Sequence, residues 1–273
     1  MIVKAAATKP LTKTALARQQ GVSVSSLYYR PRQPAKDWHL KNQIEAVLKD
    51  NPSYGHRRLA AELHANKKRV LRVMRLFGLK PYRRRGRKWK KPKEKTQVYE
   101  NLLLAAMPLY PHHIWVADFT ELSWHGQKVF VATVLDLYTR QIVGVNVALR
   151  RGAPLTAQAL WQALFAHPRP EIFHSDNGKE YEAASFIGIL RQFGILVSRS
   201  RPGAPWENGY QESWYDKFQI DLGDPNRFDA LGELVAEIYY TVWVYNHTRI
   251  HSILKMPPAV FALKQKTAMP MTA

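Results

Sequence analysis

The alternation of short apolar segments with helical segments after residue 114 is the feature that most restricts the fold of this chain. The segment 114–122, IWVADFTEL, predicts a strand with a polar end, and 128–149 predicts two β-rich strands around a turn near 139–141. We expect these three strands to be consecutive and antiparallel. Helices are then predicted at 154–167, 183–193, 210–220 and 230–245, and strands at 171–174 and 195–198. This pattern favours an α/β fold with helices on the faces of a sheet.

Residues 11–30 predict a helix-turn-helix, with a turn at Gly21 and a second helix opened by Ser23. In that motif the second helix enters the major groove of DNA, and its polar side chains face the base edges. An ordinary helical hairpin is the alternative. The predicted apolar seam is Leu16, Val22 and Leu27, and the predicted DNA contacts are Ser25, Ser26 and Tyr28.

A second helical block extends from about residue 40 to residue 79, and its middle helix begins with cations, where the helix dipole disfavours them. Phosphate binding would explain this placement; chance is the alternative. The charged segment 80–95 cannot bury enough surface to fold alone, so we interpret it as a linker or arm that follows phosphates, or as an inert tether. The candidate DNA contacts are Arg57, Arg58, Lys68, Arg69, Arg72, Arg83, Arg84, Arg85, Arg87, Lys88, Lys90 and Lys91.

The distribution of charge supports a polyanionic partner for the front of the chain. Residues 1–100 hold 26 Lys and Arg against 6 Asp and Glu, whereas the remaining residues hold 15 of each. The absence of cysteine excludes disulfides, thiolate metal sites and cysteine nucleophiles. No segment resembles a signal peptide or a membrane span, so we expect a cytoplasmic, nucleoid-associated protein without a membrane partner.

Three carboxylates are the candidate catalytic and metal-binding residues. Asp118 and Asp176 each follow an apolar strand segment, and Glu212 lies in a predicted helix. Their convergence would give an oxygen-only site suited to Mg²⁺ or Mn²⁺, and two such ions can drive an in-line displacement at phosphorus. Taken singly, each residue is better explained as a cap or turn former, and the combination of the three is what favours a metal site. The supporting candidates are Asn177, Asn208 and Asp136, whose hairpin position favours a structural or supporting role.

The motifs around these acids are WVADFTEL, VLDLYTRQIVG, HSDNGKEY and ENGYQES, and 35 residues separate Asp176 from Glu212. Together they resemble the retroviral-integrase-type (DDE) catalytic core of insertion-sequence transposases. YNHTRIHSILKMPPAVF resembles the C-terminal signature of that family, and NPSYGHRRLAAEL and KKRVLRVMRLFGL resemble its upstream helical block. The resemblance covers residues 11 to 262. In one departure, the family often has Lys or Arg seven positions after the glutamate, where this chain has Gln219, with Lys217 two residues earlier.

The resemblance implies a ribonuclease-H-like mixed sheet flanked by helices, two metal ions per active site, and cleavage and strand transfer of DNA. It is greatest to the second-frame subunit of a two-frame element, so an upstream-frame transposase subunit is a candidate partner. Because each reaction involves two DNA ends, we expect a homo-oligomer on double-stranded element-end and target DNA. The alternatives are a non-catalytic DNA-binding regulator and a metal-dependent nuclease without joining activity.

Five domains are predicted along the chain. The first two are all-α DNA-binding modules and the fourth is the ribonuclease-H-like core. The boundaries are 1–35 for the helix-turn-helix, 36–80 for the second helical module, 81–107 for the basic linker, 108–248 for the catalytic core and 249–273 for a C-terminal tail.

Overall fold

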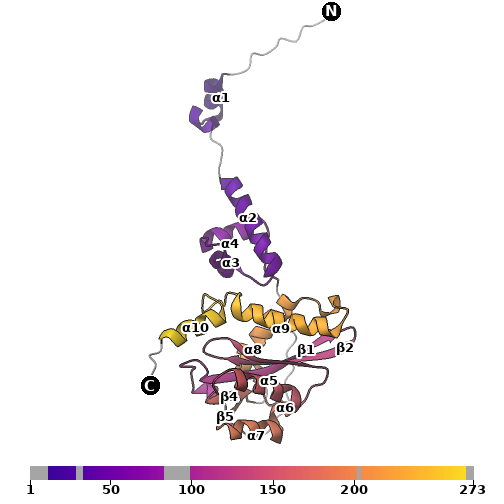
Figure 1. Cartoon of the computed structure of the whole chain (residues 1–273). Helices are drawn as coiled ribbons and strands as arrows, with labels where there is room; N and C mark the ends of the chain where they lie inside the picture. Colours follow the sequence, from indigo (N-terminus) through magenta and orange to yellow (C-terminus); the bar gives the residue numbers. More distant parts are fainter. Residues whose placement is uncertain (1–11, 29–32, 83–98, 202–203, 269–273) are drawn as a thin grey trace, which may run out of the picture.

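The computed structural model describes residues 12–28, 33–82, 99–201 and 204–268, and shows an all-α N-terminal region followed by an α/β core (Figure 1). The core contains one five-stranded sheet in the order β3-β2-β1-β4-β5. The first three strands pair antiparallel, and β4 and β5 are parallel to β1. The sheet is therefore mixed, as expected. The strands are β1 (Ile114–Trp124), β2 (Gln127–Asp136), β3 (Ile142–Ala148), β4 (Ile172–Ser175) and β5 (Leu196–Arg199).

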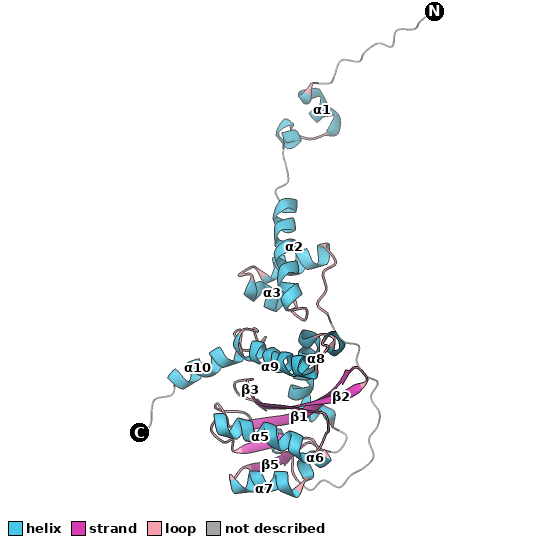
Figure 2. Ribbon diagram, turned by 45° about the vertical axis from the view of Figure 1, so that its right-hand side comes forward, coloured by secondary structure: helices cyan, strands magenta, loops and turns pink. Residues whose placement is uncertain are grey.

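Helices cover both faces of the sheet because side chains alternate along its strands. Trp115 and Ala117 of β1 face the cluster formed with α5 and α7, whereas Val116 and Leu122 face α8 and α9 (Figure 2). Each face thus has its own apolar core, and a residue's position in β1 fixes which layer it belongs to. The helices of the core are α5 (Ala153–Ala166), α6 (Lys179–Glu182), α7 (Ala184–Gln192), α8 (Gly209–Leu222), α9 (Leu231–His247) and α10 (Pro258–Ala268). Short 3-10 turns occur at Leu102–Leu104, Pro205–Asn208 and Pro225–Arg227.

The first predicted motif is only partly a helix-turn-helix. Helix α1 (Lys13–Gln20) ends at Gly21 in the left-handed conformation, which confirms the predicted turn. The second element is a five-residue 3-10 helix, η1 (Val24–Tyr28), and not the predicted α-helix. Val22 is 42% exposed and Ala17 is buried, so the predicted apolar seam is wrong at Val22.

The second predicted block is a compact three-helix module of α2 (Gln33–Asp50), α3 (His56–Glu62) and α4 (Lys67–Leu76). Its own apolar core includes Ile44, Leu59 and Val73, all fully buried. Asn66 caps α4 by accepting hydrogen bonds from the Lys68 and Arg69 backbone amides. The α3–turn–α4 unit, rather than α1 and η1, therefore provides two true α-helices joined by a short turn.

Residues 249–268, which the sequence assigns to a tail, pack against the rest of the molecule. The Ile250 amide donates a hydrogen bond to the Tyr54 hydroxyl in the helical module (2.9 Å). Tyr138 in the β2–β3 turn donates to Gln265 of α10 (3.1 Å). The C-terminal segment thus connects the helical module to the core. Among the described helices, none combines the length and the apolar character that crossing a membrane requires.

Candidate active site

Asp118 lies in the middle of β1, so the predicted strand-end position is wrong for this residue. The neighbouring strand β4 nevertheless ends close to Asp118, because β4 pairs with β1 only as far as Val116, which is opposite His174. Two residues beyond that last pair lie Asp118 on β1 and Asp176 directly after β4. The parallel register therefore brings the two carboxylates side by side at the edge where β4 ends.

The charges of these acids act on one another. Burial, the charge of Asp176 and, less strongly, that of Glu212 raise the pKa of Asp118 to about 8, against a hydrogen bond from the Phe119 amide. Although Glu212 is exposed in the first turn of α8, local loss of water and the charge of Asp216 raise its pKa as well. The charges of both other acids thus disfavour the ionised form of Asp118.

The loop after β4 orients Asp176. Its Oδ1 accepts a hydrogen bond from the Gly178 amide (2.9 Å), and the neighbouring Asn177 donates to the Ser200 carbonyl (2.5 Å). A Cβ atom at Gly178 would lie 2.9 Å from Asp176 Oδ1, closer than real Cβ contacts allow. A glycine is therefore required here for the observed position of the carboxylate, and the Asn177 bond ties the loop to the residue after β5.

Helix α8 is fastened to β1 by side chains that bond to the strand's backbone. Asn208 donates to the Ala117 carbonyl (3.4 Å), Gln211 to that of Val116 (2.7 Å) and Tyr215 to that of Asp118 (2.7 Å). These three residues have the spacing of one helix face. They hold the helix that carries Glu212 beside the strand that carries Asp118.

Gln211 and Tyr215 were not identified from the sequence. Both reach Thr133, the β2 residue paired with Asp118, at 3.2 Å from Gln211 and 2.8 Å from Tyr215. The signal was a buried polar face at positions 208, 211 and 215. Recognising this signal requires knowing that the face packs against the backbone of β1.

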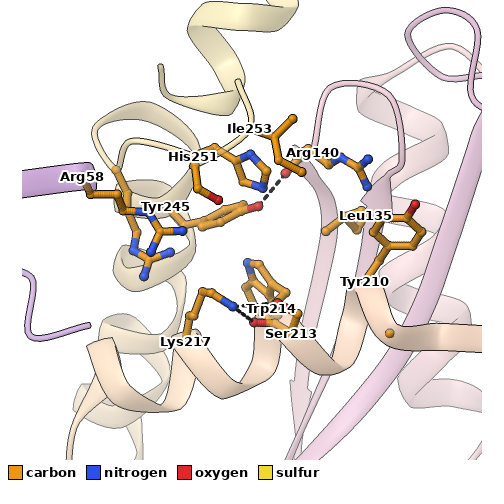
Figure 3. Close-up of a pocket in the computed structure, with 13 residues that line it drawn as sticks. Arg58, Leu135, Arg140, Tyr210, Ser213, Trp214, Lys217, Tyr245, His251 and Ile253 are labelled. Carbon is orange, nitrogen blue, oxygen red and sulfur yellow. Dashed lines mark hydrogen bonds between the residues drawn. The ribbon is translucent and has the colours of Figure 1, made fainter. Parts of the chain in front are cut away.

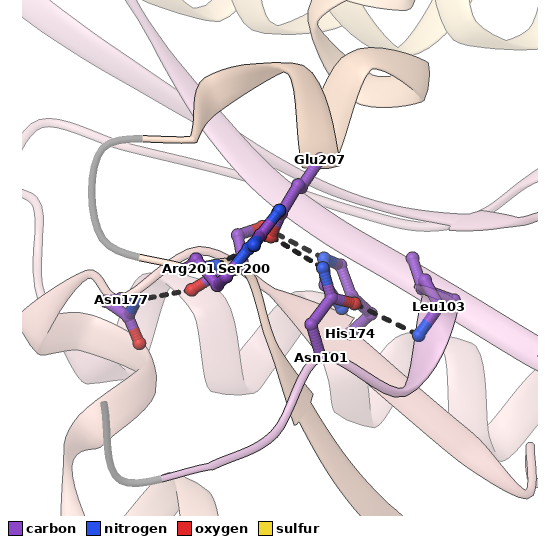
Figure 4. Close-up of polar contacts among 7 residues, drawn as sticks. All are labelled: Asn101, Leu103, His174, Asn177, Ser200, Arg201 and Glu207. Atoms are coloured by element: carbon purple, nitrogen blue, oxygen red, sulfur yellow. Dashed lines mark hydrogen bonds and ion pairs between the residues drawn. The ribbon is translucent and has the colours of Figure 1, made fainter. Parts of the chain in front are cut away.

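Glu207 fixes the segment that leads into α8 (Figure 4). Its carboxylate accepts hydrogen bonds from the Arg201 backbone and guanidinium (2.7 and 2.6 Å) and from the Asn101 side chain (2.6 Å). Burial alone would raise the pKa of Glu207, but these bonds outweigh burial and lower it. Glu207 is thus an ionised structural anchor rather than a member of the acidic set.

Asp136 lies apart from the acids. It is at the end of β2 on the sheet face opposite Asp118 and is fully buried. Its carboxylate accepts hydrogen bonds from the Thr139 hydroxyl (2.6 Å) and from the Tyr138 amide (3.2 Å), which shape the β2–β3 turn. Of the two roles open to it, the structural one holds, and its place among the supporting residues of the site is wrong.

Lys217 and Gln219, which follow Glu212 in α8, have side chains that point in different directions. Gln219 donates to the Thr120 hydroxyl on β1 (2.7 Å), whereas Lys217 bonds to Ser213 on the other side of α8. Lys217 is therefore not a substitute for a cation at the position of Gln219.

The acids offer oxygen ligands, the donor type that Mg²⁺ and Mn²⁺ prefer. Within the ranges that the structure describes, no three His, Cys, Asp or Glu side chains are close enough to hold one ion. Asp118 and Asp176 form the adjacent pair, and the charge of Glu212 affects the pKa of Asp118 less than that of Asp176 does.

The predicted DNA contacts fall into four groups. Arg57, Lys68 and Arg69 are exposed on the helical module, and Arg58 is partly buried. Arg72 is engaged, because its guanidinium forms a bidentate ion pair with buried Asp37 (2.5 and 2.8 Å), so its assignment to DNA is not supported by its geometry. Ser25 and Ser26 are exposed and bond to Ser23. The side chain of Tyr28 and all of Arg83, Arg84, Arg85, Arg87, Lys88, Lys90 and Lys91 lie outside the described residues.

Comparison with known families assigns both parts of the chain. Residues 109–205 and 193–258 match two families described as integrase core domain, and residues 36–87 match an HTH-like domain. The latter covers the three-helix module rather than residues 1–35. Over 80% of this chain and 76% of that chain, the fold is similar to the cryoEM structure of a simian T-cell lymphotropic virus intasome in complex with PP2A regulatory subunit B56 gamma (TM-score 0.50, 15% identity). The ribonuclease-H-like assignment is confirmed.

Relatives of similar length are named as insertion-sequence proteins. The transposase for insertion sequence element IS904 of Lactococcus lactis subsp. lactis (strain IL1403) is 30% identical over 78% of this chain and 88% of its own length. The IS600 uncharacterized 31 kDa protein of Shigella sonnei is 31% identical over 89% of this chain and 96% of its own length. With an HTH-like module, an integrase core and this extent of similarity, the chain belongs to the insertion-sequence transposases, a family of polynucleotidyl transferases.

Proposed function

We propose that this chain binds the ends of its DNA element, cleaves them and joins the resulting 3′-hydroxyl to another phosphodiester, using Asp118, Asp176 and Glu212. The observation that carries the proposal is the strand register, which sets Asp118 of β1 beside Asp176 after β4. The raised pKa of Asp118 supports it, because clustered carboxylates with perturbed pKa values are typical of functional sites.

The same three residues fit a divalent metal site by their chemistry. Asp118 and Asp176 would hold Mg²⁺ or Mn²⁺, and Glu212 would complete the ligands. When bound, a pair of such ions supplies activation of the attacking oxygen and stabilisation of the leaving oxygen in phosphoryl transfer. A carboxyl whose pKa is near 8 must lose its proton to bind a cation, so metal binding and proton release are coupled at Asp118.

The remaining site residues of the chain position these carboxylates. Tyr215 and Gln211 hold α8 against β1, while Gly178 and Asn177 hold the loop that carries Asp176. Asn208 contributes a longer bond to the same strand. None of these side chains needs to change its partner for the carboxylates to act, so the scaffold is organised before DNA arrives.

DNA binding is proposed to begin at the HTH-like module. Lys68 and Arg69 are exposed in the first turn of α4, and Arg57 is exposed at the start of α3, so these cations are accessible to phosphates. Since two element ends react together, we propose a homo-oligomer on DNA, with an upstream-frame subunit as a further partner. Action on bacterial DNA would place the protein in the cytoplasm with the nucleoid.

The test is a joining assay with labelled element ends and the variants Asp118→Asn, Asp176→Asn and Glu212→Gln. Each should abolish strand transfer while retaining most of the DNA affinity, because each removes one charge from the site and none from the HTH-like module. Glu121→Gln is the matched control, because Glu121 is an exposed carboxylate on the same strand, paired with Lys128 (3.1 Å).

The products separate the alternatives. Covalent linkage of the labelled 3′ end to new DNA supports a transposase, whereas cleavage without linkage would identify a nuclease. A protein that binds DNA but shows neither product, and gains no thermal stability from Mg²⁺, would be a regulator. Retention of joining by any of the three acidic variants would refute the assignment of that residue.

A further inference from the structure

A cavity of about 490 Å³ lies where the HTH-like module meets the core (Figure 3). Its lining comes from α3, α8, the β2–β3 turn, the end of α9 and the segment that follows α9. The basic residues of the lining are three arginines, one lysine and one histidine, and no Asp or Glu is among the described residues that line the cavity. They are Arg58, Arg140, Lys217, Arg249 and His251. This lining has the composition of an anion site.

The cavity is separate from the acidic centre. Helix α8 turns Tyr210, Ser213 and Lys217 toward the cavity, while Glu212 lies on another face of the same helix. With about 100° of rotation per residue, Lys217 is roughly 140° around the helix from Glu212. A ligand in the cavity therefore does not occupy the place of the scissile phosphate.

Among the described residues, Arg58, Arg140 and Lys217 form no ion pair, although the charge of Asp221 acts on Arg58 and Lys217 and that of Asp216 acts on Lys217. Arg249 is neutralised, since it forms an ion pair with Asp221 (2.8 Å) behind the lining. By contrast, Arg58 Nε, Arg140 Nη1 and His251 Nδ1 are buried without a hydrogen-bond partner among the described residues. Buried donors are normally paired, so the two guanidinium nitrogens at one cavity indicate an acceptor that belongs there, while the role of His251 Nδ1 depends on the tautomer of the neutral ring.

Aromatic rings hold two of these guanidinium groups in place. Arg140 stacks on Tyr210 (4.4 Å from the ring centroid), and Arg58 lies over Tyr54 (5.7 Å). The backbone carbonyl of Arg140 also accepts a hydrogen bond from Tyr245 (2.8 Å), which fixes the turn that carries it. Stacking orients a guanidinium but leaves its charge and most of its donors available.

Burial and the repulsion among the cations lower the pKa values of two residues in the lining. Burial lowers the pKa of His251 to about 4, with contributions from Arg140 and Arg58 and smaller ones from Arg249 and Lys217. Burial and the charges of Arg58 and Arg249 also lower the pKa of Lys217. An anion would relieve both effects, because it favours the charged forms.

We propose that this cavity binds a phosphate group of a nucleic-acid strand, held by Arg58, Arg140 and Lys217. The planar donors of the two arginines suit phosphate oxygens, and Lys217 retains donor capacity beyond its bonds to Ser213. Arg58 belongs to the HTH-like module and Arg140 to the core, so the bound phosphate would link the two. The assignment of the phosphate to a nucleic acid rests on the proposed DNA binding of this chain, but not on its proposed cleavage and joining of DNA.

The experiment measures binding by the full chain without divalent metal, so it is independent of joining. Inorganic phosphate is titrated against sodium chloride of equal ionic strength, with the thermal midpoint as the readout. A short labelled duplex of arbitrary sequence is then titrated at several salt concentrations. The variants are Arg58→Gln and Arg140→Gln, and Arg191→Gln on exposed α7, at the other face of the sheet, is the charge-matched control.

Phosphate should stabilise the wild type specifically, compete with the duplex and lose its effect in both cavity variants. Each variant should bind the duplex about tenfold more weakly and lower the slope of log affinity against log salt by about 1 relative to the control. Because competition is measured on the wild type, misfolding of a variant does not decide the result. Phosphate binding that fails to compete with DNA would indicate a free-anion site and refute the nucleic-acid source. No specific phosphate effect, with cavity variants equal to the control, would refute the site itself.

Discussion

Replacing Asp118 by Asn should make the metal-free protein more stable, and increasingly so as the pH rises toward 8. The pKa of Asp118 is raised to about 8 in the folded protein by burial and by the charge of Asp176, against a value near 4 in the unfolded chain. Between these values the folded state binds the proton and the unfolded state does not. Stability that depends on this group is therefore present at low pH and lost as the pH rises.

The magnitude follows from proton linkage. One proton bound only by the folded state lowers the free energy of unfolding by about 1.4 kcal/mol per pH unit. From about pH 5 to about pH 7 the loss is at most about 2.7 kcal/mol in the wild type and absent in Asp118→Asn. Buried histidines with lowered pKa values, such as His174 and His251, contribute in the opposite direction at the acidic end. The difference between the two proteins cancels these contributions.

Urea unfolding in the presence of EDTA measures this difference directly. Glu121→Gln, an exposed carboxylate on the same strand, should remain parallel to the wild type over this range. Excess Mg²⁺ should remove the pH-dependent loss in the wild type but not change Asp118→Asn, because a bound cation takes the place of the proton. Parallel curves for the wild type and Asp118→Asn would show that Asp118 does not lie in a cluster of like charges.

Three further changes test the positioning residues and the helical module. Gly178→Ala should lower the rate of joining by about tenfold to a hundredfold with near-normal folding, because the Cβ atom of the alanine displaces the Asp176 carboxylate. Unchanged single-turnover joining rates would contradict this. Tyr215→Phe should cost about 1–3 kcal/mol in urea unfolding, because it removes the buried hydroxyl that donates to the Asp118 carbonyl, and a loss below experimental error would count against the fastening of α8 to β1. The Arg72 hydrogen bonds lower the pKa of Asp37, so the stability that this pair gives is present at neutral pH and is lost as the pH falls below about 4. Asp37→Asn should remove that acid-dependent loss in thermal melts. An unchanged loss of stability at low pH in the variant would refute this role of the pair.

The helices and strands of the core were largely predictable because each depends on a local pattern. The hairpin around residues 139–141, the strand before Asp176 and the helix carrying Glu212 all lie where apolar periodicity and turn residues predict them. The basic front and neutral rear of the chain likewise need no coordinates, since charge is a property of composition.

Only the tertiary structure decided which of these residues meet. Asp118 is mid-strand, yet the shorter β4 leaves it beside Asp176, whereas Asp136, equally acidic and close in sequence, lies on the opposite face. The pairing of Arg72 with Asp37 and the charged cavity also could not be predicted from the sequence. The physical reason is that periodicity reports how a segment divides its own faces, whereas a register, a buried hydrogen bond or a cluster of charges depends on a second segment whose position no local pattern contains.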